Sequence, residues 1–324
     1  MRLKKKVRDE KKNQHFVPRS FLRNFTIDSS SLIWGYDKKL SKCTGKRSIN
    51  RICSSNYYYE QLMPNGEKSQ LLEDQFQSIE KPASEIIRNI AVSKNLPSHE
   101  KGCLALYIGL LLTRGPSFRN GIHEFHKHIA EITLQKEYES GRLPELPAIL
   151  EKHIVNKDIT SVMTAEILPQ VSLSYMVNLA ITIGISLCKK KWDIYLVENN
   201  EVLVTSDTPV MFESISPKEN QCIGPAHPES LVLCPITKTM LIAIRPYHKC
   251  DCSSFEVMSL KCGIASKLNE MMCFNAQRFV YASEQSHELL GYIKKTRRYS
   301  KKSKSWRLGD AIISQWGIYI EPFD

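Results

Sequence analysis

The chain has 324 residues, of which 42% are hydrophobic, and its formal net charge at pH 7 is +11. This length allows one large hydrophobic core or two smaller ones, so the composition predicts a soluble globular protein. No apolar run reaches the roughly 18 to 20 residues that a membrane helix requires, and no apolar stretch of a secretion signal follows the basic N-terminus. We therefore expect a cytoplasmic protein without a membrane span, and ten scattered cysteines fit a reducing compartment.

The basic charge is concentrated at the two ends of the chain. Residues 1–12 contain seven basic residues and two acids, and residues 294–307 contain eight basic residues and no acid. Local charge of this kind suits contact with a nucleic acid or another polyanion, and Tyr299 and Trp306 could stack on bases. A solvated tail is the alternative. The predicted nucleic-acid contacts are Lys294, Lys295, Arg297, Arg298, Lys301 and Lys302.

The first half of the chain is predicted to be mainly helical. Pro18 is suited to the first position of a short helix that ends near Asn24, and short strands are expected at 31–36 and 57–59. A helix at 67–92 follows from apolar residues spaced by three and four, and Pro82 should kink or split it. This apolar stripe comprises Leu72, Phe76, Ile79, Ala83, Ile86 and Ile90. Further helices are expected from Ser98 to a Gly-Pro break at 115–116, and at 117–139, 144–153 and 160–187.

The second half of the chain changes to short runs of branched and aromatic residues. These runs predict strands at 192–197, 202–205, 231–234, 240–244 and 279–282, with a helix at about 254–275 between them. The expected fold class is α+β, in which a helical N-terminal half packs on a mixed or antiparallel sheet formed mostly by the C-terminal half. Residues 1–12 form a basic arm, 13–292 one domain, and 293–324 a basic segment with a short terminal strand.

The segment NQHFVPRSFLRNF, residues 13–25, contains the first candidate site residues. His15 lies in a segment stiffened by Pro18 and could act as a general base or a metal ligand, although a structural histidine is the alternative. Arg19 is a candidate for binding substrate. The string HFVP is similar to the HIVP string of HNH nucleases, but the downstream Asn and His of that motif are missing, so we exclude that family.

Acidic and basic candidates follow in the central helices. Glu73 and Glu80 are seven residues apart, on one helix face beside the apolar stripe, where carboxylates could hold a metal or a guanidinium. Arg114 ends an apolar run and needs a partner or a ligand, and Arg119 follows closely. An ion pair of Arg114 with Glu73 or Glu80 and an anion-binding site are both open at this point.

In the second half, the turn Thr205-Ser206-Asp207-Thr208-Pro209 is the strongest candidate. A predicted strand delivers Asp207 into a proline-stiffened turn, where an aspartate is either a metal ligand or base or a turn former. Ser206 is a candidate substrate contact. The histidines of HEFHKH at 123–128 do not have the HExxH spacing of zincins, and no Walker loop, GxGxxG or GxSxG is present.

Four of these strings, in this order, resemble a known family. NQHFVPRSFLRNF resembles the QHYVPR-type opening motif of the bacterial domain-of-unknown-function family 4238, LLTRGPSFR at 111–119 its central arginine motif, and VTSDTPV at 204–210 its TSDNP-type turn. LVLCPITKTMLIAI at 231–244 resembles its strand-proline-strand element. Phe16 and Thr208 differ from the usual Tyr and Asn. The resemblance supports the choice of site residues, but it implies no reaction.

The sequence therefore leads to three functional hypotheses. The first is a metal-dependent hydrolase of nucleic-acid or nucleotide phosphodiesters, used in phage defence or bacterial conflict. In this hypothesis Asp207 with Glu80 or Glu73 binds Mg²⁺ or Mn²⁺, His15 is base or ligand, and Arg114 and Arg119 neutralise phosphate. The second is a noncatalytic nucleic-acid-binding module whose motif residues form a buried polar network. The third is a toxin or regulatory protein that acts through protein contacts.

Overall fold

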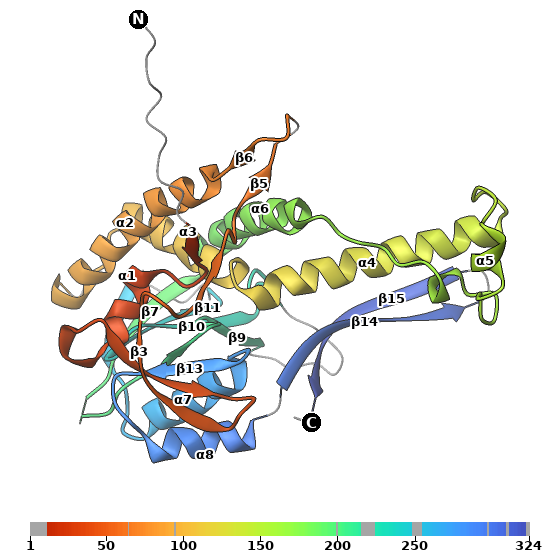
Figure 1. The fold of residues 1–324 in the computed structure, drawn as a ribbon. Helices are drawn as coiled ribbons and strands as arrows, with labels where there is room; N and C mark the ends of the chain where they lie inside the picture. Colours follow the sequence, from red (N-terminus) through yellow and green to blue (C-terminus); the bar gives the residue numbers. More distant parts are fainter. Residues whose placement is uncertain are drawn as a thin grey trace, which may run out of the picture.

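The computed structural model describes residues 12–63, 65–93, 95–198, 200–214, 224–247, 255–296, 298–308 and 311–321. Helices cover one face of a five-stranded sheet, and two further helices with a four-stranded sheet cover the other face (Figure 1). Most helical residues precede the five-stranded sheet in the chain. The predicted α+β class, with a helical first half packed on a largely C-terminal sheet, is confirmed.

The N-terminal region is built from short elements. They are β1 (Asn13–His15), α1 (Arg19–Leu22), the 3₁₀ helices η1 (Arg23–Phe25) and η2 (Ile27–Ser29), β2 (Leu32–Asp37), β3 (Lys42–Ser48), β4 (Ser54–Asn56), β5 (Gln61–Leu62) and β6 (Lys68–Ser69). β1 pairs antiparallel with β4, so the opening motif is held by a segment about forty residues later. The strand expected at 57–59 is wrong: Tyr57 has a φ of 53° and begins a turn.

The helical part follows the predicted periodicity closely. It comprises α2 (Leu71–Ser93), α3 (Ser98–Thr113), α4 (Pro116–Glu139), α5 (Ala148–Glu151), η3 (Ile159–Ser161) and α6 (Pro169–Cys188). The apolar stripe of α2 faces the core, since five of its six residues are buried and Ile79 is partly buried. Pro82 does not split α2. The helix predicted at 160–187 begins only at Pro169, where proline is favoured as a first helical residue.

The sheets come mainly from the second half. The elements are β7 (Lys191–Leu196), β8 (Thr205–Ser206), β9 (Met211–Ser214), β10 (Ser230–Thr237), β11 (Met240–Arg245), β12 (Phe255–Ser259), α7 (Ile264–Asn275), β13 (Phe279–Ala282), α8 (His287–Lys295), β14 (Arg298–Leu308) and β15 (Ala311–Glu321). The larger sheet has the order β12-β7-β11-β10-β9, and the smaller has β3-β2-β13-β8.

Both faces of β11 are buried, which explains its continuous apolar sequence. Ile242 and Ile244 face the core under α3, and Leu241 and Ala243 face the core under α7. The predicted helix at 254–275 is wrong in its first part, because residues 255–259 form β12 and pair in parallel with β7. The early strand β2 joins the smaller sheet beside β13.

α3 and α6 pack closely because each has a glycine at the contact. A Cβ atom on Gly109 would collide with the backbone of Ala180, and one on Gly184 would lie 3.1 Å from the Cα of Leu106. Among the described helices, only α6 is long and apolar enough to cross a membrane. It packs along α3 and buries Leu173, Met176 and Ala180, whereas Ile181 and Ile185 are exposed.

The C-terminal segment forms a hairpin rather than the short strand expected. β14 and β15 pair antiparallel over eleven residues each, and the hairpin runs beside α4 (Figure 1). Lys294 and Lys295 are exposed in the last turn of α8. Arg297 and residues 1–11 lie outside the described residues, as do the side chains of Arg298, Lys301 and Lys302.

The α3–α6 contact gives a prediction about stability. Gly109→Ala should lower the free energy of unfolding by about 1 to 3 kcal/mol, because the added methyl group would force the two helices apart. Gly102→Ala in the same helix is the matched control, since no atom lies within 4 Å of the position that its added Cβ would take. Urea unfolding followed by circular dichroism measures both. Equal stability of the two variants would contradict close packing at Gly109.

Candidate functional site

Arg114 lies at the centre of the site. It is the C-cap residue of α3 and follows eight buried positions in that helix, so its side chain emerges inside the core. Only 1% of its surface is exposed. Because water cannot reach a charged group in this environment, the protein must supply acceptors for its N–H groups. The sequence prediction that Arg114 needs a partner is confirmed by the contacts of its guanidinium group.

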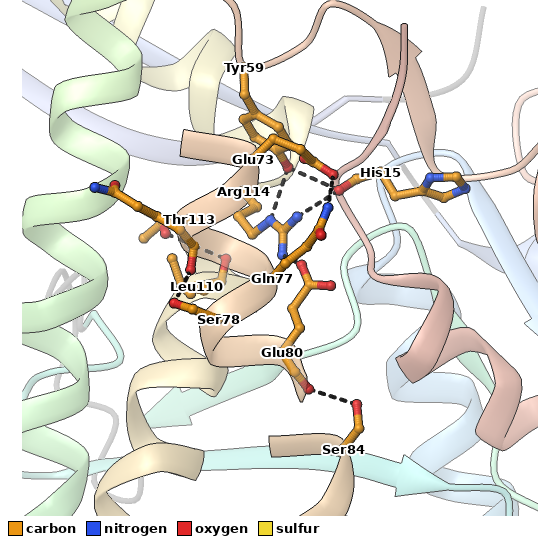
Figure 2. Close-up of polar contacts among 11 residues, drawn as sticks. His15, Tyr59, Glu73, Gln77, Ser78, Glu80, Ser84, Leu110, Thr113 and Arg114 are labelled. Atoms are coloured by element: carbon orange, nitrogen blue, oxygen red, sulfur yellow. Dashed lines mark hydrogen bonds and ion pairs between the residues drawn. The ribbon is translucent and has the colours of Figure 1, made fainter. Parts of the chain in front are cut away.

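The guanidinium group of Arg114 contacts three separate segments (Figure 2). Its Nε donates to the hydroxyl of Tyr59 at 2.9 Å, one terminal nitrogen donates to Glu80 at 2.5 Å, and the other donates to the backbone carbonyl of His15 at 2.7 Å. The rings of Tyr59 and Phe76 lie 5.2 and 4.7 Å from its central carbon. Tyr59 also donates its own hydroxyl hydrogen to the His15 carbonyl at 3.1 Å.

These contacts keep Arg114 charged. Burial alone would lower the pKa of the guanidinium group, but Tyr59 and Glu80 together raise it. Burial also raises the pKa of the Tyr59 hydroxyl to about 12, so Tyr59 is a neutral hydrogen-bond donor and acceptor near pH 7. Glu80, with 18% of its side chain exposed, is therefore the counter-ion. The sequence left two interpretations of Arg114 open, an ion pair and an anion-binding site. The structure contains the ion pair with Glu80.

His15 has different roles for its backbone and its side chain. The carbonyl group points to Arg114, whereas the imidazole ring points away from the guanidinium group (Figure 2). The ring Nε2 lies 3.2 Å from the carbonyl oxygen of Ile49. Since a carbonyl can only accept, Nε2 must carry the hydrogen, and Nδ1 of the neutral ring is then a hydrogen-bond acceptor. Burial lowers the pKa of His15 to about 4, so the ring is neutral near pH 7.

His15 lines a cleft of about 650 Å³, which we call the His15 cleft. The cleft lies between the opening motif and α2. Its polar lining residues are Asn13, His15, Arg19, Ser20, Arg23, Asn50, Glu73, Gln77, Glu80 and Arg114. Glu73 accepts a hydrogen bond from Gln77 on the next turn of α2 at 3.2 Å. Five of the residues predicted from the sequence therefore come together here: His15, Arg19, Glu73, Glu80 and Arg114.

Two exposed guanidinium groups lie at the rim of the His15 cleft. Arg19 and Arg23 are four residues apart on consecutive helical turns, so they share one face. Arg19 donates to the side chain of Asn50 at 3.4 Å. Within the described part of the chain, no carboxylate forms an ion pair with either arginine. Both can therefore bind an anion from solvent.

Arg119 lies outside the His15 cleft and connects three elements. Its guanidinium group donates to Ser172 on α6 at 3.1 Å and to the carbonyl of Tyr58 at 2.5 Å, and it stacks on the ring of Tyr58 at 4.5 Å. Tyr58 in turn donates to the carbonyl of Arg114 at 2.9 Å. These contacts fix the start of α4 against α6 and the tyrosine turn.

Asp207 is 6% exposed and faces backbone rather than the His15 cleft. Its carboxylate accepts from the amides of Gln277, Arg278 and Phe279 at 2.8 to 2.9 Å. Burial raises the pKa of Asp207, and the three amides act against that increase. The neighbouring Ser206 is fully buried and accepts from the amide of Thr208 at 3.0 Å. Asp207 therefore holds the β8 turn against the start of β13, and Ser206 closes the turn itself.

Asp207 and Glu80, proposed above as ligands of one metal ion, line different cavities. Asp207 borders a mainly apolar cavity of about 440 Å³ beside Gly115 and Phe118, and Glu80 borders the His15 cleft. No group of three His, Cys, Asp or Glu side chains with metal-site geometry occurs within the described ranges.

The sequence reasoning missed the residues that complete the Arg114 network. Tyr58 and Tyr59 lie in a turn and not in the strand expected there, and the side chain of Gln14 accepts from the amide of Tyr59 at 2.6 Å. The run of three tyrosines at 57–59 was the available signal, because adjacent aromatic rings are frequent partners of buried guanidinium groups.

A comparison with known families gives one match. A family model described as protein of unknown function (DUF4238) matches residues 13–286, which includes the opening motif, α2, Arg114 and the Asp207 turn. No curated protein and no solved structure matches the chain.

The Arg114 network predicts a large loss of stability when the guanidinium group is removed. Arg114→Met should lower the free energy of unfolding by about 3 kcal/mol or more, because Glu80 and the His15 carbonyl lose their donor inside the core. The control is Arg142→Met, whose ion pair with Glu137 is exposed and should contribute less than about 1 kcal/mol. Urea unfolding measures both, and similar losses would show that the Arg114 network adds little.

His15 predicts a pH dependence of stability. The folded protein binds a proton at His15 only below a pKa of about 4, whereas the unfolded chain does so near 6.5. Between these values the unfolded state binds more protons, so His15 lowers stability as the pH falls from about 6.5 to 4. His15→Gln should weaken this dependence in urea unfolding at pH 7.5, 5.5 and 4.5. His99→Gln, at an exposed position of α3, should leave it unchanged.

Proposed function

Because the chain belongs to the DUF4238 family, whose description names no activity, we propose a function from the His15 cleft: hydrolysis of a phosphodiester in nucleic acid or a nucleotide. The observation that carries the proposal is that His15, a neutral imidazole whose Nδ1 is a hydrogen-bond acceptor, lines the same cleft as two carboxylates and two exposed guanidinium groups. These are a proton acceptor, acidic groups and an anion-binding pair.

Each group has a role in this reaction. Arg19 and Arg23 bind the nonbridging oxygens of the phosphate group, because both are exposed and share one face at the rim. Nδ1 of His15 takes a proton from a water molecule, and the water oxygen forms a bond to phosphorus while the ester P–O bond breaks. The leaving oxygen takes the proton back from the imidazolium group or from solvent. The products are a phosphomonoester and an alcohol.

A divalent cation, Mg²⁺ or Mn²⁺, belongs to the same proposal. Glu73 and Glu80 line the cleft from one face of α2, and only one oxygen of Glu80 is bonded to Arg114. Mg²⁺ is commonly held by one or two carboxylates together with water and substrate phosphate oxygens, so a set of two carboxylates is sufficient. The ion would neutralise charge on the phosphate group.

The second candidate function is a nucleic-acid-binding module without catalysis. The burial of Arg114 and Asp207 favours it, because the two motifs that contain these residues then serve the fold rather than chemistry. The two candidates differ at His15, whose ring has no role in the Arg114 network and is required only for hydrolysis.

His15→Gln tests the proposed hydrolysis. Hydrolysis of bis(p-nitrophenyl) phosphate and of a single-stranded oligonucleotide is measured with Mg²⁺, with Mn²⁺ and with EDTA. The substitution should lower kcat about 10²-fold to 10⁴-fold, as expected for the loss of a general base, while the melting temperature at pH 7.5 changes little. His99→Gln is the control and should retain activity. If wild type is no faster than His15→Gln under every condition, the hydrolase proposal is wrong.

A further inference from the structure

A second, larger cavity adjoins the His15 cleft on the side of β3. Its volume is about 1170 Å³, and its lining residues come from β3, the segment after it, and the start of β13. Asn13 and Asn50 line both cavities, so the two are neighbours. We call this larger cavity the basic groove, because Lys42, Lys46, Arg47 and Arg51 line it.

These four basic side chains are exposed. No carboxylate in the described ranges forms an ion pair with them. Lys46 lies over the ring of Trp34 at 5.6 Å, and Arg47 donates to Thr44 at 3.4 Å. In contrast, Arg278, which also lines the groove, is paired with Asp37 at 2.9 Å. The groove therefore presents uncompensated positive charge.

The spacing of the charges suits a chain of phosphates better than a single phosphate. Lys42 and Arg47 pair with Asp37 and Ile33 of β2, which are four residues apart on one face of that strand, a distance of about 13 Å at the rise of a β-strand. One strand of nucleic acid advances about 3.4 Å per phosphate in a helix, so Lys42 and Arg47 would contact different phosphates. Phe16 and Phe279, both half-buried, add apolar surface for bases in the groove.

We propose that the basic groove binds single-stranded nucleic acid and leads one phosphodiester into the His15 cleft. This binding site extends the proposed hydrolase function, and cleavage of the bound strand rests on that function. A single strand fits because its unpaired bases can reach the side-chain amides of Asn13 and Asn50, which line both cavities. In this proposal the nucleic acid contacts β3 and the segment after it, and not the basic ends of the chain.

The test replaces the four cations by glutamine. The variant carries Lys42→Gln, Lys46→Gln, Arg47→Gln and Arg51→Gln, and the matched control carries Lys136→Gln, Lys152→Gln, Lys157→Gln and Lys189→Gln, which are exposed and line neither cavity. Binding of fluorescein-labelled dT₁₂ and U₁₂ is measured by anisotropy from 50 to 300 mM NaCl, in EDTA. The protein for binding carries His15→Gln in every case, so that no strand is cleaved.

The groove variant should bind at least tenfold more weakly at 50 mM NaCl. The slope of log affinity against log salt should fall by about 3, because each lost phosphate contact on a single strand contributes about 0.7. The control should bind within twofold of the parent. An unchanged groove variant, or an equal loss in the control, overturns the proposal. Equal affinity for a duplex or for polyglutamate overturns the assignment of a single strand.

Hydrolysis of bis(p-nitrophenyl) phosphate separates this inference from the proposed function. This small diester reaches the His15 cleft without the groove, so the groove substitutions in an otherwise wild-type chain should leave its hydrolysis unchanged, while oligonucleotide hydrolysis falls. If the small diester is not hydrolysed but the binding results hold, the hydrolase function fails and the groove stands as a binding site. If the small diester is hydrolysed but the groove variant binds oligonucleotides as tightly as the parent, only the groove proposal is wrong.

Discussion

The structure of the N-terminal half depends on the solvation of one buried charge. The guanidinium group of Arg114 lies where water cannot solvate it, so the protein must supply its hydrogen-bond partners. Those partners come from β1, the tyrosine turn and α2, three segments that adjoin one another only in the folded chain. The opening motif is therefore held in place by the end of α3, and the walls of the His15 cleft are set by the same contact.

A second buried charge has the same effect in the C-terminal half. Asp207 binds three consecutive amides at the start of β13 and thereby joins β8 to a segment about seventy residues later. Next to these amides, Arg278 pairs with Asp37 of β2, so the smaller sheet is tied across its strands. Two of the sequence motifs are thus anchors of the fold. Around His15 and along β3, by contrast, polar side chains line open cavities.

Local periodicity predicted the parts of the fold that local interactions determine. The stripe of α2 and the apolar length of α3 specify helices by themselves, and the branched residues of β11 specify a strand. Residues 255–259 were misassigned because their strand exists through pairing with β7, more than sixty positions earlier. For the same reason, the order of motifs identified Arg114 and Asp207 as special residues but could not show that their side chains face inward. Lys46 and its neighbours were not singled out, because a polar, lysine-rich segment between two predicted strands is common. The position of this segment beside the opening motif is a tertiary property.

The position of His15 in the Arg114 network has a consequence for how such a site can change during evolution. Arg114 contacts the backbone carbonyl of residue 15, which every amino acid possesses, and not the imidazole ring. The ring can be exchanged while the support beneath it keeps all of its hydrogen bonds. The scaffold and the reactive group at this position are therefore under separate constraints, and related chains could keep the same cleft while replacing its chemistry through a single codon.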